Sequence, residues 1–289
     1  MFETIDMSKR LLEAIQQRGA GSNIIKNLAE IIKNSDDSYD ELQQTNIPTL
    51  GIIEVGFWKT TKGTRRSINS FYIRDYGVGM SIEEVKKAYG KKSYGEDTSK
   101  NRRNGAIGVG GKDALYGMID IDIITIQNSI PTLIHLQTPH GILEYELIEN
   151  RNLVLKTMSK INNQIRNVST TLNLNHDGTF VKFRLPETRN GYRFDTLRDS
   201  LRDYYSLRNI TNGKNTTKLK LINMDTGETF DLQRNEPESE IVKKLDPIQI
   251  PHTNKKGVQE HYQVDIVIKR AKEELEHGKD YGQNFLIET

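Results

Sequence analysis

The chain has 289 residues, of which 35% are hydrophobic and 28% charged, and its 41 basic and 39 acidic residues give a net charge of +2. This length suits one large domain or two ordinary ones, and the near balance of charge neither requires nor excludes a nucleic-acid partner. Disulfides, thiolate nucleophiles and zinc knuckles are excluded because the sequence contains no cysteine.

The sequence also lacks the signals of a membrane or secreted protein. No apolar run approaches the roughly 20 residues needed to span a bilayer. The N-terminus, "MFETIDMSKRLLEAIQQRG", lacks the basic-then-apolar layout of a signal peptide. We therefore expect a cytoplasmic globular protein.

The N-terminal part of the chain predicts helices and one pair of strands. Residues 3–18 predict a short amphipathic helix, and a second helix is expected from about Ser22 to Leu42, with Ser22 or Asn23 as its N-cap. Two alternating runs, "LGIIEVGFW" and "SINSFYIRD", predict strands that "KTTKGTRR" joins as a turn. A third helix is expected at about residues 82–89.

A long polar segment and a β-rich segment follow. Residues 90–111 are basic and glycine-rich without a periodic apolar face, and a loop of that length inside a compact domain is more often functional than idle. Residues 119–185 predict a β-meander, in which "NLVLKTM" is one strand and "TFVKFRL" the last. Pro186 and Glu187 indicate a domain boundary, after which a helix at "FDTLRDSLRDYYSLR" and a strand-rich segment from about residue 217 are expected.

The second predicted helix carries polar residues on one face. Glu30, Asn34 and Asp37 stand at i, i+4 and i+7, within roughly 60° of each other. The apolar residues lie on the opposite face: Ile24, Ile25, Leu28, Ile31 and Ile32. The polar face is either a solvated acidic surface or the wall of a site. In such a site a carboxylate could activate water and an amide oxygen could coordinate Mg²⁺.

The segment "IRDYGVGM", residues 73–80, joins a strand end to a helix through an acid and two glycines. A carboxylate at Asp75 can accept a hydrogen bond from an exocyclic amine such as that of adenine. Gly77 and Gly79 would let the backbone approach a flat ring that a Cβ would displace. The same pattern also occurs in ordinary turns, so this segment alone leaves both interpretations open.

A second glycine-rich segment, "GAIGVGGKDALYG" at residues 105–117, leads into a predicted helix. Unpaired N–H groups at a helix N-terminus suit phosphate. The segment is not a P-loop, because Ala106 and Asp113 replace required residues, and it lacks the third glycine of a Rossmann motif. It predicts either a phosphate site or a flexible hinge.

Taken together, these motifs form an ordered set: the acid-amide helix, Asp-x-Gly-x-Gly, a basic loop ending in Gly-x-Gly-x-Lys, and "DGT" before a late strand. This set resembles the GHKL ATPases, which include heat-shock chaperones, MutL, gyrase B-type subunits, histidine-kinase catalytic domains and MORC proteins. The resemblance covers about residues 20–187 and is closest to the MORC-like and MutL-like branches. No upstream phosphoacceptor histidine precedes the motifs, which disfavours a self-contained histidine kinase.

The resemblance implies roles for individual residues. Glu30 would activate the attacking water, Asn34 would hold Mg²⁺, and Asp37 would lie near the nucleotide. Asp75 would bind the adenine amine, supported through a shared water by Thr179. The wall around the base would be formed by three residues of the same turn: Gly77, Gly79 and Met80.

The resemblance also implies how the phosphates are held. Residues 90–111 would form an ATP lid, in which "YGKKS", ending at Ser93, resembles a MORC segment. The phosphate contacts would come from Gly108, Val109, Gly110, Gly111 and Lys112, and Ile107 is a further nucleotide-binding candidate. Lys255 and Lys256 are candidates for a lysine that a second domain donates to the γ-phosphate.

The fold implied is α+β: a two-layer Bergerat sandwich with a mixed, mostly antiparallel sheet and helices on one face. Residues 1–187 would form the ATP-binding domain, and residues 188–289 a connecting helix and part of a transducer-like domain within a longer protein. The implied activity is slow Mg²⁺-dependent ATP hydrolysis, with ATP-driven lid closure and homodimerisation. The alternative is a non-catalytic ATP-sensing module. The sequence does not decide whether the target is DNA, as in a MORC-like phage-defence system, or a partner protein.

Overall fold

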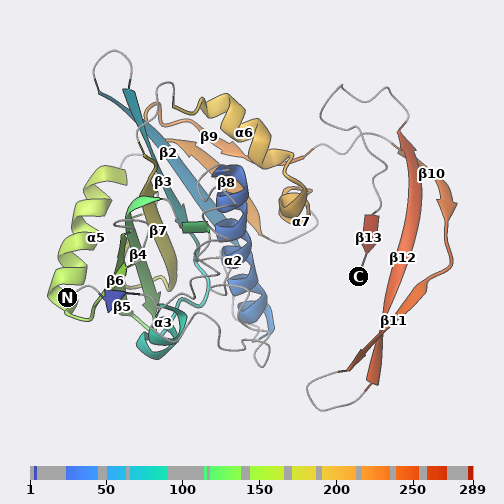
Figure 1. Ribbon diagram of the computed structural model, residues 1–289, viewed down its shortest axis with the longest axis horizontal. Coiled ribbons are helices and arrows are strands. Elements are labelled where there is room, and N and C mark those ends of the chain that lie inside the picture. The colour runs from blue at the N-terminus through green and yellow to red at the C-terminus, as the bar shows by residue number, and fades with distance from the viewer. Residues whose placement is uncertain are drawn as a thin grey trace. The chain divides into compact units, whose positions relative to one another are not determined.

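The computed structural model describes residues 3–4, 24–44, 51–62, 66–89, 114–115, 118–137, 144–165, 171–186, 191–212, 217–234, 239–253, 259–271 and 286–288. The chain divides into two compact units, Met1–Arg234 and Asn235–Thr289 (Figure 1). Each unit contains its own sheet.

The described strands of the first unit form one nine-stranded sheet in the order β1-β6-β5-β4-β7-β3-β2-β8-β9. Neighbouring strands are antiparallel except β2 and β8, which run parallel. The strands are β1 (Glu3–Thr4), β2 (Ile52–Lys62), β3 (Arg66–Arg74), β4 (Ile119–Gln127), β5 (Ile130–Gln137), β6 (Glu144–Ile148), β7 (Gly178–Arg184), β8 (Lys218–Asn223) and β9 (Thr229–Asp231). The α+β class is therefore confirmed, as are the strands predicted on either side of residues 59–66.

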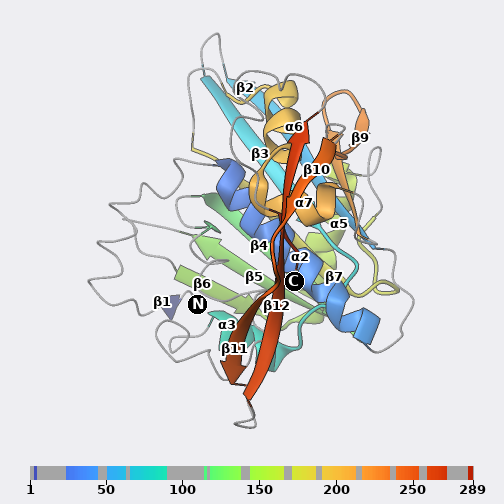
Figure 2. The ribbon, with the colours of Figure 1, turned by 90° about the vertical axis from the view of Figure 1, so that its right-hand side faces the viewer.

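Helices cover both faces of this sheet (Figure 1). One face carries α2 (Ile24–Gln44), α3 (Ile82–Tyr89), α6 (Phe194–Arg202), the 3-10 helix η3 (Tyr205–Leu207) and α7 (Arg208–Thr211). Figure 2 looks onto the side of the sheet that carries α2 and α6. The opposite face packs against α5 (Arg151–Ile165).

Helix α5 corrects two expectations: that helices lie on one face only, and that "NLVLKTM" is a strand. Its N-terminus is capped by Asn150, whose side-chain oxygen accepts the N–H groups of Asn152 and Leu153 at 3.1 and 3.3 Å. Its buried residues recur at helical spacing: Val154, Met158, Ile161 and Ile165. The segment is helical because this stripe fills the second face of the sheet.

Strand alternation assigns residues to the two faces. On β3, Phe71 and Ile73 belong to the core under α2, whereas Tyr72 belongs to the core under α5. Asp75 continues the odd-numbered series just beyond the strand end, and so lies toward α2.

The expected domain boundary at residue 187 falls inside the first unit. Strands β7 and β8 point the same way, because β7 and β3, and then β3 and β2, are antiparallel while β2 and β8 are parallel. Parallel strands of one sheet require a crossover connection. The helices between residues 194 and 211 supply it, so this segment belongs to the first sheet and does not open a second domain.

The second unit is an antiparallel sheet of β10 (Ser239–Lys244), β11 (Ile248–Thr253), β12 (Gln259–Ala271) and β13 (Leu286–Glu288), in which β12 pairs with the other three strands. The predicted strand "HYQVDIVIKR" lies within β12. Of the helix predicted over residues 3–18, only Glu3–Thr4 is described, and these two residues form β1. None of the described helices has both the length and the apolar character needed to cross a membrane.

Candidate functional site

The carboxylate of Asp75 lies immediately after β3, at 5% exposure. The main-chain N–H groups of Gly77 and Thr179 both donate to its Oδ1 at 3.0 Å, and the Ser35 hydroxyl also donates to the carboxylate. The N–H of Asp75 in turn donates to the carbonyl of Thr179 at 3.0 Å. Because an ionised carboxylate has about four acceptor positions, these three hydrogen bonds leave about one acceptor position of the carboxylate unused within the described residues.

Burial makes the charge of Asp75 costly. It raises the pKa of this carboxyl from 3.8 to about 6, against the opposing effect of the hydrogen bonds from Gly77, Thr179 and Ser35 and of the positive charge of Arg74. The guanidinium of Arg74 is itself buried and lies 4.5 Å from the ring centre of Tyr76. Asp75 is therefore mostly ionised at neutral pH and serves as a hydrogen-bond acceptor.

Packing within the protein already requires the two glycines of the turn. A Cβ on Gly77 would collide with the hydroxyl of Ser38 on α2. Gly79 has a φ of +65°, and a Cβ there would collide with the carbonyl of Ile126 on β4. The expectation that both glycines make room for adenine stays a prediction beside this structural reason.

Helix α2 contacts the turn through residues that the sequence analysis missed. The Tyr39 hydroxyl accepts the N–H of Tyr76 at 2.7 Å and donates to the carbonyl of Ile52 at 2.5 Å. Burial raises the pKa of Tyr39 far above its ordinary value, which keeps this donor protonated. Ser35 provided a readable signal, because it stands four residues after Ile31 and four before Tyr39, inside the apolar stripe.

The polar face of α2 lies beside these contacts. The predicted apolar face is confirmed, with Ile25 only partly buried and the other four isoleucine and leucine residues buried. Asn34 is one turn from Ser38, and Glu30 is one turn further toward the N-terminus of the helix. Glu30 and Asn34 are half-buried, whereas Asp37 is exposed.

Glu30 also faces the crossover segment that follows β7. Helix α2 contacts both α6 and η3. Burial, then Tyr205, and then the charge of Glu30 raise the pKa of Tyr204, which places Glu30 within electrostatic reach of that ring. The helix that supports Asp75 therefore also holds Glu30 near Tyr204, about two helical turns from the end of α2 that contacts the Asp75 turn.

The remaining predicted residues fall into two groups. The main-chain N–H of Met80 donates to the hydroxyl of the buried Thr125 at 2.7 Å, which fixes the end of the turn. Thr179 contacts Asp75 directly through its main chain, and the shared water stays a prediction. The other predicted residues lie outside the described residues: Ser93, Ile107, Gly108, Val109, Gly110, Gly111, Lys112, Lys255, Lys256 and the lid as a whole.

Comparison with models of known protein families gives no match, and comparison with curated proteins gives no significant similarity. Within the described residues, no three histidine, aspartate or glutamate side chains lie together as a metal site. A functional assignment therefore depends on the motifs and geometry of this chain.

The raised pKa of Asp75 predicts how stability changes with pH. A folded-state pKa above the ordinary value means that protonation of Asp75 favours the folded state. The stability that this protonation contributes is complete below pH 3.8 and is lost as the pH rises through about 6. A shift of about two pH units corresponds to about 3 kcal/mol. In urea unfolding, we expect the free energy of unfolding of the wild type, minus that of Asp75→Asn, to fall by about 2 kcal/mol between pH 4 and pH 7.

Subtracting the free energy of unfolding of Asp75→Asn from that of the wild type removes the pH dependence of the other titrating groups, because the two proteins share them. A difference that stays constant over this pH range, or that grows as the pH rises, would contradict the placement of Asp75 as a buried ionised group.

Proposed function

We propose that this protein binds ATP with Mg²⁺ and hydrolyses it slowly, as a GHKL-type module. In this proposal ATP closes the segment 90–111 over the site and brings two copies together, as in an ATP-driven clamp of the MORC-like or MutL-like kind. The four ordered motifs support it, and so does the mixed sheet that carries α2 across one face.

The observation that carries the proposal is the carboxylate of Asp75. It is buried, its Oδ1 is held by two main-chain N–H groups, and one acceptor position is left for a donor. An adenine amine satisfies that position, whereas guanine presents a carbonyl oxygen at the corresponding ring position, which would meet the carboxylate as a second acceptor. The site therefore favours adenine over guanine.

The reacting end of the nucleotide is assigned to the N-terminal half of α2. In the proposal, the half-buried Glu30 accepts a proton from the attacking water and orients it. Its position near Tyr204 and the crossover segment supports a partly desolvated carboxylate, because that side of α2 is covered by η3.

The residues present fit Mg²⁺ in the way this ion is usually held. Mg²⁺ is commonly bound by one or two protein oxygens together with phosphates and water. The half-buried amide of Asn34, one helical turn from Glu30, would supply such an oxygen. When bound, the ion would offset the negative charge of the phosphates.

The discrimination between ATP and GTP tests the binding part of the proposal. We expect the wild type to bind ATP and Asp75→Asn to bind it more than about tenfold more weakly, because an amide donor would then face the adenine amine. Titration calorimetry with ATP and GTP at neutral pH measures this. The control is Asp195→Asn, which changes an exposed aspartate on α6.

ATP affinity that is unchanged in Asp75→Asn would contradict the adenine assignment. A lower ATP affinity with an equal loss for GTP would show that the substitution disturbs the fold of the turn and not the recognition of the base.

The substitution Glu30→Gln tests hydrolysis separately from binding. We expect turnover to fall by about 100-fold or more, because a general base contributes about that much, while a non-hydrolysable ATP analogue keeps its affinity. Phosphate release and analogue binding are measured side by side, with the exposed Glu83→Gln on α3 as the control.

Two outcomes would contradict parts of this assignment. Loss of analogue binding in Glu30→Gln would remove Glu30 from the role of base. Tight ATP binding without turnover in the wild type would favour the alternative function, a nucleotide sensor that switches a partner surface.

A further inference from the structure

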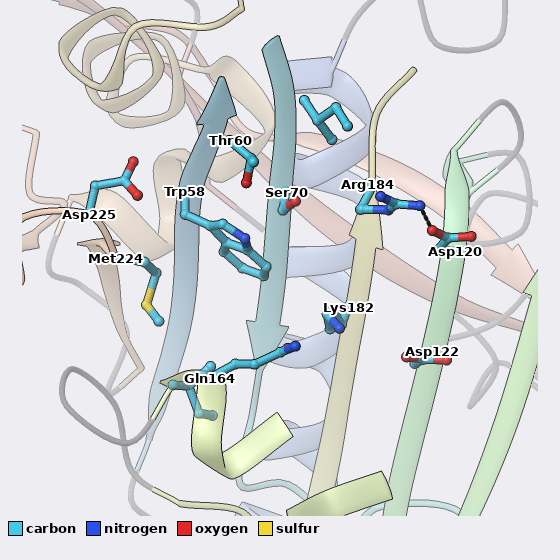
Figure 3. A pocket seen from close by; sticks show the side chains of 12 residues that line it. Trp58, Thr60, Ser70, Asp120, Asp122, Gln164, Lys182, Arg184, Met224 and Asp225 are labelled. Carbon is cyan, nitrogen blue, oxygen red and sulfur yellow. Dashed lines mark ion pairs between the residues drawn. The ribbon is translucent and has the colours of Figure 1, made fainter. Parts of the chain in front are cut away.

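The sheet face opposite Asp75 contains a second candidate site. Helix α5 covers only part of this face, and a cavity of about 630 Å³ lies beside its C-terminal end, next to Gln164 (Figure 3). The even-numbered residues of β2, β3 and β7 line it, among them Trp58, Ser70 and Lys182. Its size is that of an ordinary small-molecule site, and the sheet separates it from the turn at Asp75.

Two of the carboxylates in this cavity already have basic side chains as partners. Asp120 forms an ion pair with Arg184. The Oδ1 of Asp122 lies 2.5 Å from Nδ1 of His135, and this hydrogen bond raises the pKa of the imidazole and favours its charged form. These two acids are therefore compensated within the protein.

Lys182 is the cation that remains. It lies inside β7, opposite Asp122 on one side and Tyr72 on the other, and its side chain is half-buried. In the part of the chain that the structure describes, Lys182 has no ion-pair partner. An ammonium group that lines a cavity without an ion-pair partner favours an anion from outside the chain.

The other end of the cavity has the opposite charge. Asp225 follows β8, and its Oδ2 accepts the main-chain N–H of Lys59 at 3.0 Å, which holds the carboxylate beside the strand that carries Trp58. Its other oxygen, Oδ1, has no partner within the described residues. Asp225 is exposed, and its carboxylate and the indole of Trp58, which line the same cavity, would both attract a cation.

The two uncompensated charges lie on opposite sides of Trp58 (Figure 3). Strands β7, β3, β2 and β8 are neighbours in that order. Three strand spacings of about 4.8 Å separate the backbones that carry Lys182 and Asp225 by on the order of 14 Å. Both side chains line the cavity, so the gap between their charged groups suits a short, flexible molecule.

We propose that this cavity binds a small zwitterion, whose anionic group pairs with Lys182 and whose cationic group lies against Trp58 and Asp225. The apolar part of such a molecule would pack on the indole and on Met224. Ser70 supplies a hydroxyl between the two ends. This site is independent of the proposed nucleotide site.

The chain offers a direct reporter, because Trp58 is its single tryptophan. Intrinsic fluorescence of the full-length chain therefore follows this cavity without interference from other indoles. The probes are 6-aminohexanoate, which carries both charges, and hexanoate and hexylammonium, which carry one each. We expect 6-aminohexanoate to bind about tenfold more tightly than either singly charged probe, since it gains a second ionic contact.

Substitutions at the two ends separate the contributions. Lys182→Gln should reduce the affinity for 6-aminohexanoate to that of hexylammonium, and Asp225→Asn should reduce it to that of hexanoate. Asn retains the acceptor for the Lys59 N–H, so the loop geometry is preserved. The matched control is Lys156→Gln, which changes an exposed lysine on α5.

If hexanoate binds as tightly as 6-aminohexanoate, the proposed binding of a cationic group at Trp58 and Asp225 is overturned. If hexylammonium binds as tightly as 6-aminohexanoate, the proposed binding of an anionic group at Lys182 is overturned. The absence of any saturable change in Trp58 fluorescence would overturn the site. Retained hexylammonium binding in Lys182→Gln shows that the variant is folded, so a loss confined to the doubly charged probe supports the proposal.

Discussion

The buried carboxylate of Asp75 is the constraint on which the proposed nucleotide site depends. Burial opposes its charge and raises its pKa to about 6, while N–H groups from its own turn and from β7 and a hydroxyl from α2 stabilise the ionised form. A carboxylate in this position without those donors would be protonated or would destabilise the fold. One charged group therefore holds the end of β3, the start of β7 and helix α2 together, and its remaining acceptor position is the one that the proposed function assigns to a ligand donor.

Helix α2 connects that anchor to the residues assigned to the chemistry. Ser35 and Tyr39 contact the turn, while Glu30 and Asn34 occupy the preceding turns of the same helix. Ser38 stands eight residues after Glu30, a rise of about 12 Å along the helix axis, so a ligand anchored at Asp75 must extend beside α2 to reach Glu30. The crossover that leads into β8 contacts α2 through η3, and Glu30 lies within electrostatic reach of Tyr204 there.

Local patterns predicted the parts of this protein whose structure is set locally. The alternation in β2 and β3 and the apolar stripe of α2 were readable, and Asp-x-Gly-x-Gly correctly singled out a buried acid at a strand end. Helix α5 was missed because Leu153, Val154 and Leu155 form a continuous apolar run, whereas its helical character depends on the Asn150 cap and on packing against the second face of the sheet. The boundary near Pro186 was wrong because the parallel pairing of β8 with β2 joins residues far apart in the sequence. Tyr39 acquires its role only through tertiary contacts with the turn, and the sequence signal for Ser35 was limited to its place inside the apolar stripe.

A crystal structure of the full chain with Mg²⁺ and a non-hydrolysable ATP analogue tests the central claim most directly. We expect the exocyclic amine of adenine at about 3 Å from the carboxylate of Asp75, with the triphosphate extending beside α2 toward Asn34 and Glu30. A nucleotide bound elsewhere on the chain, or one whose base lies away from Asp75, would contradict it.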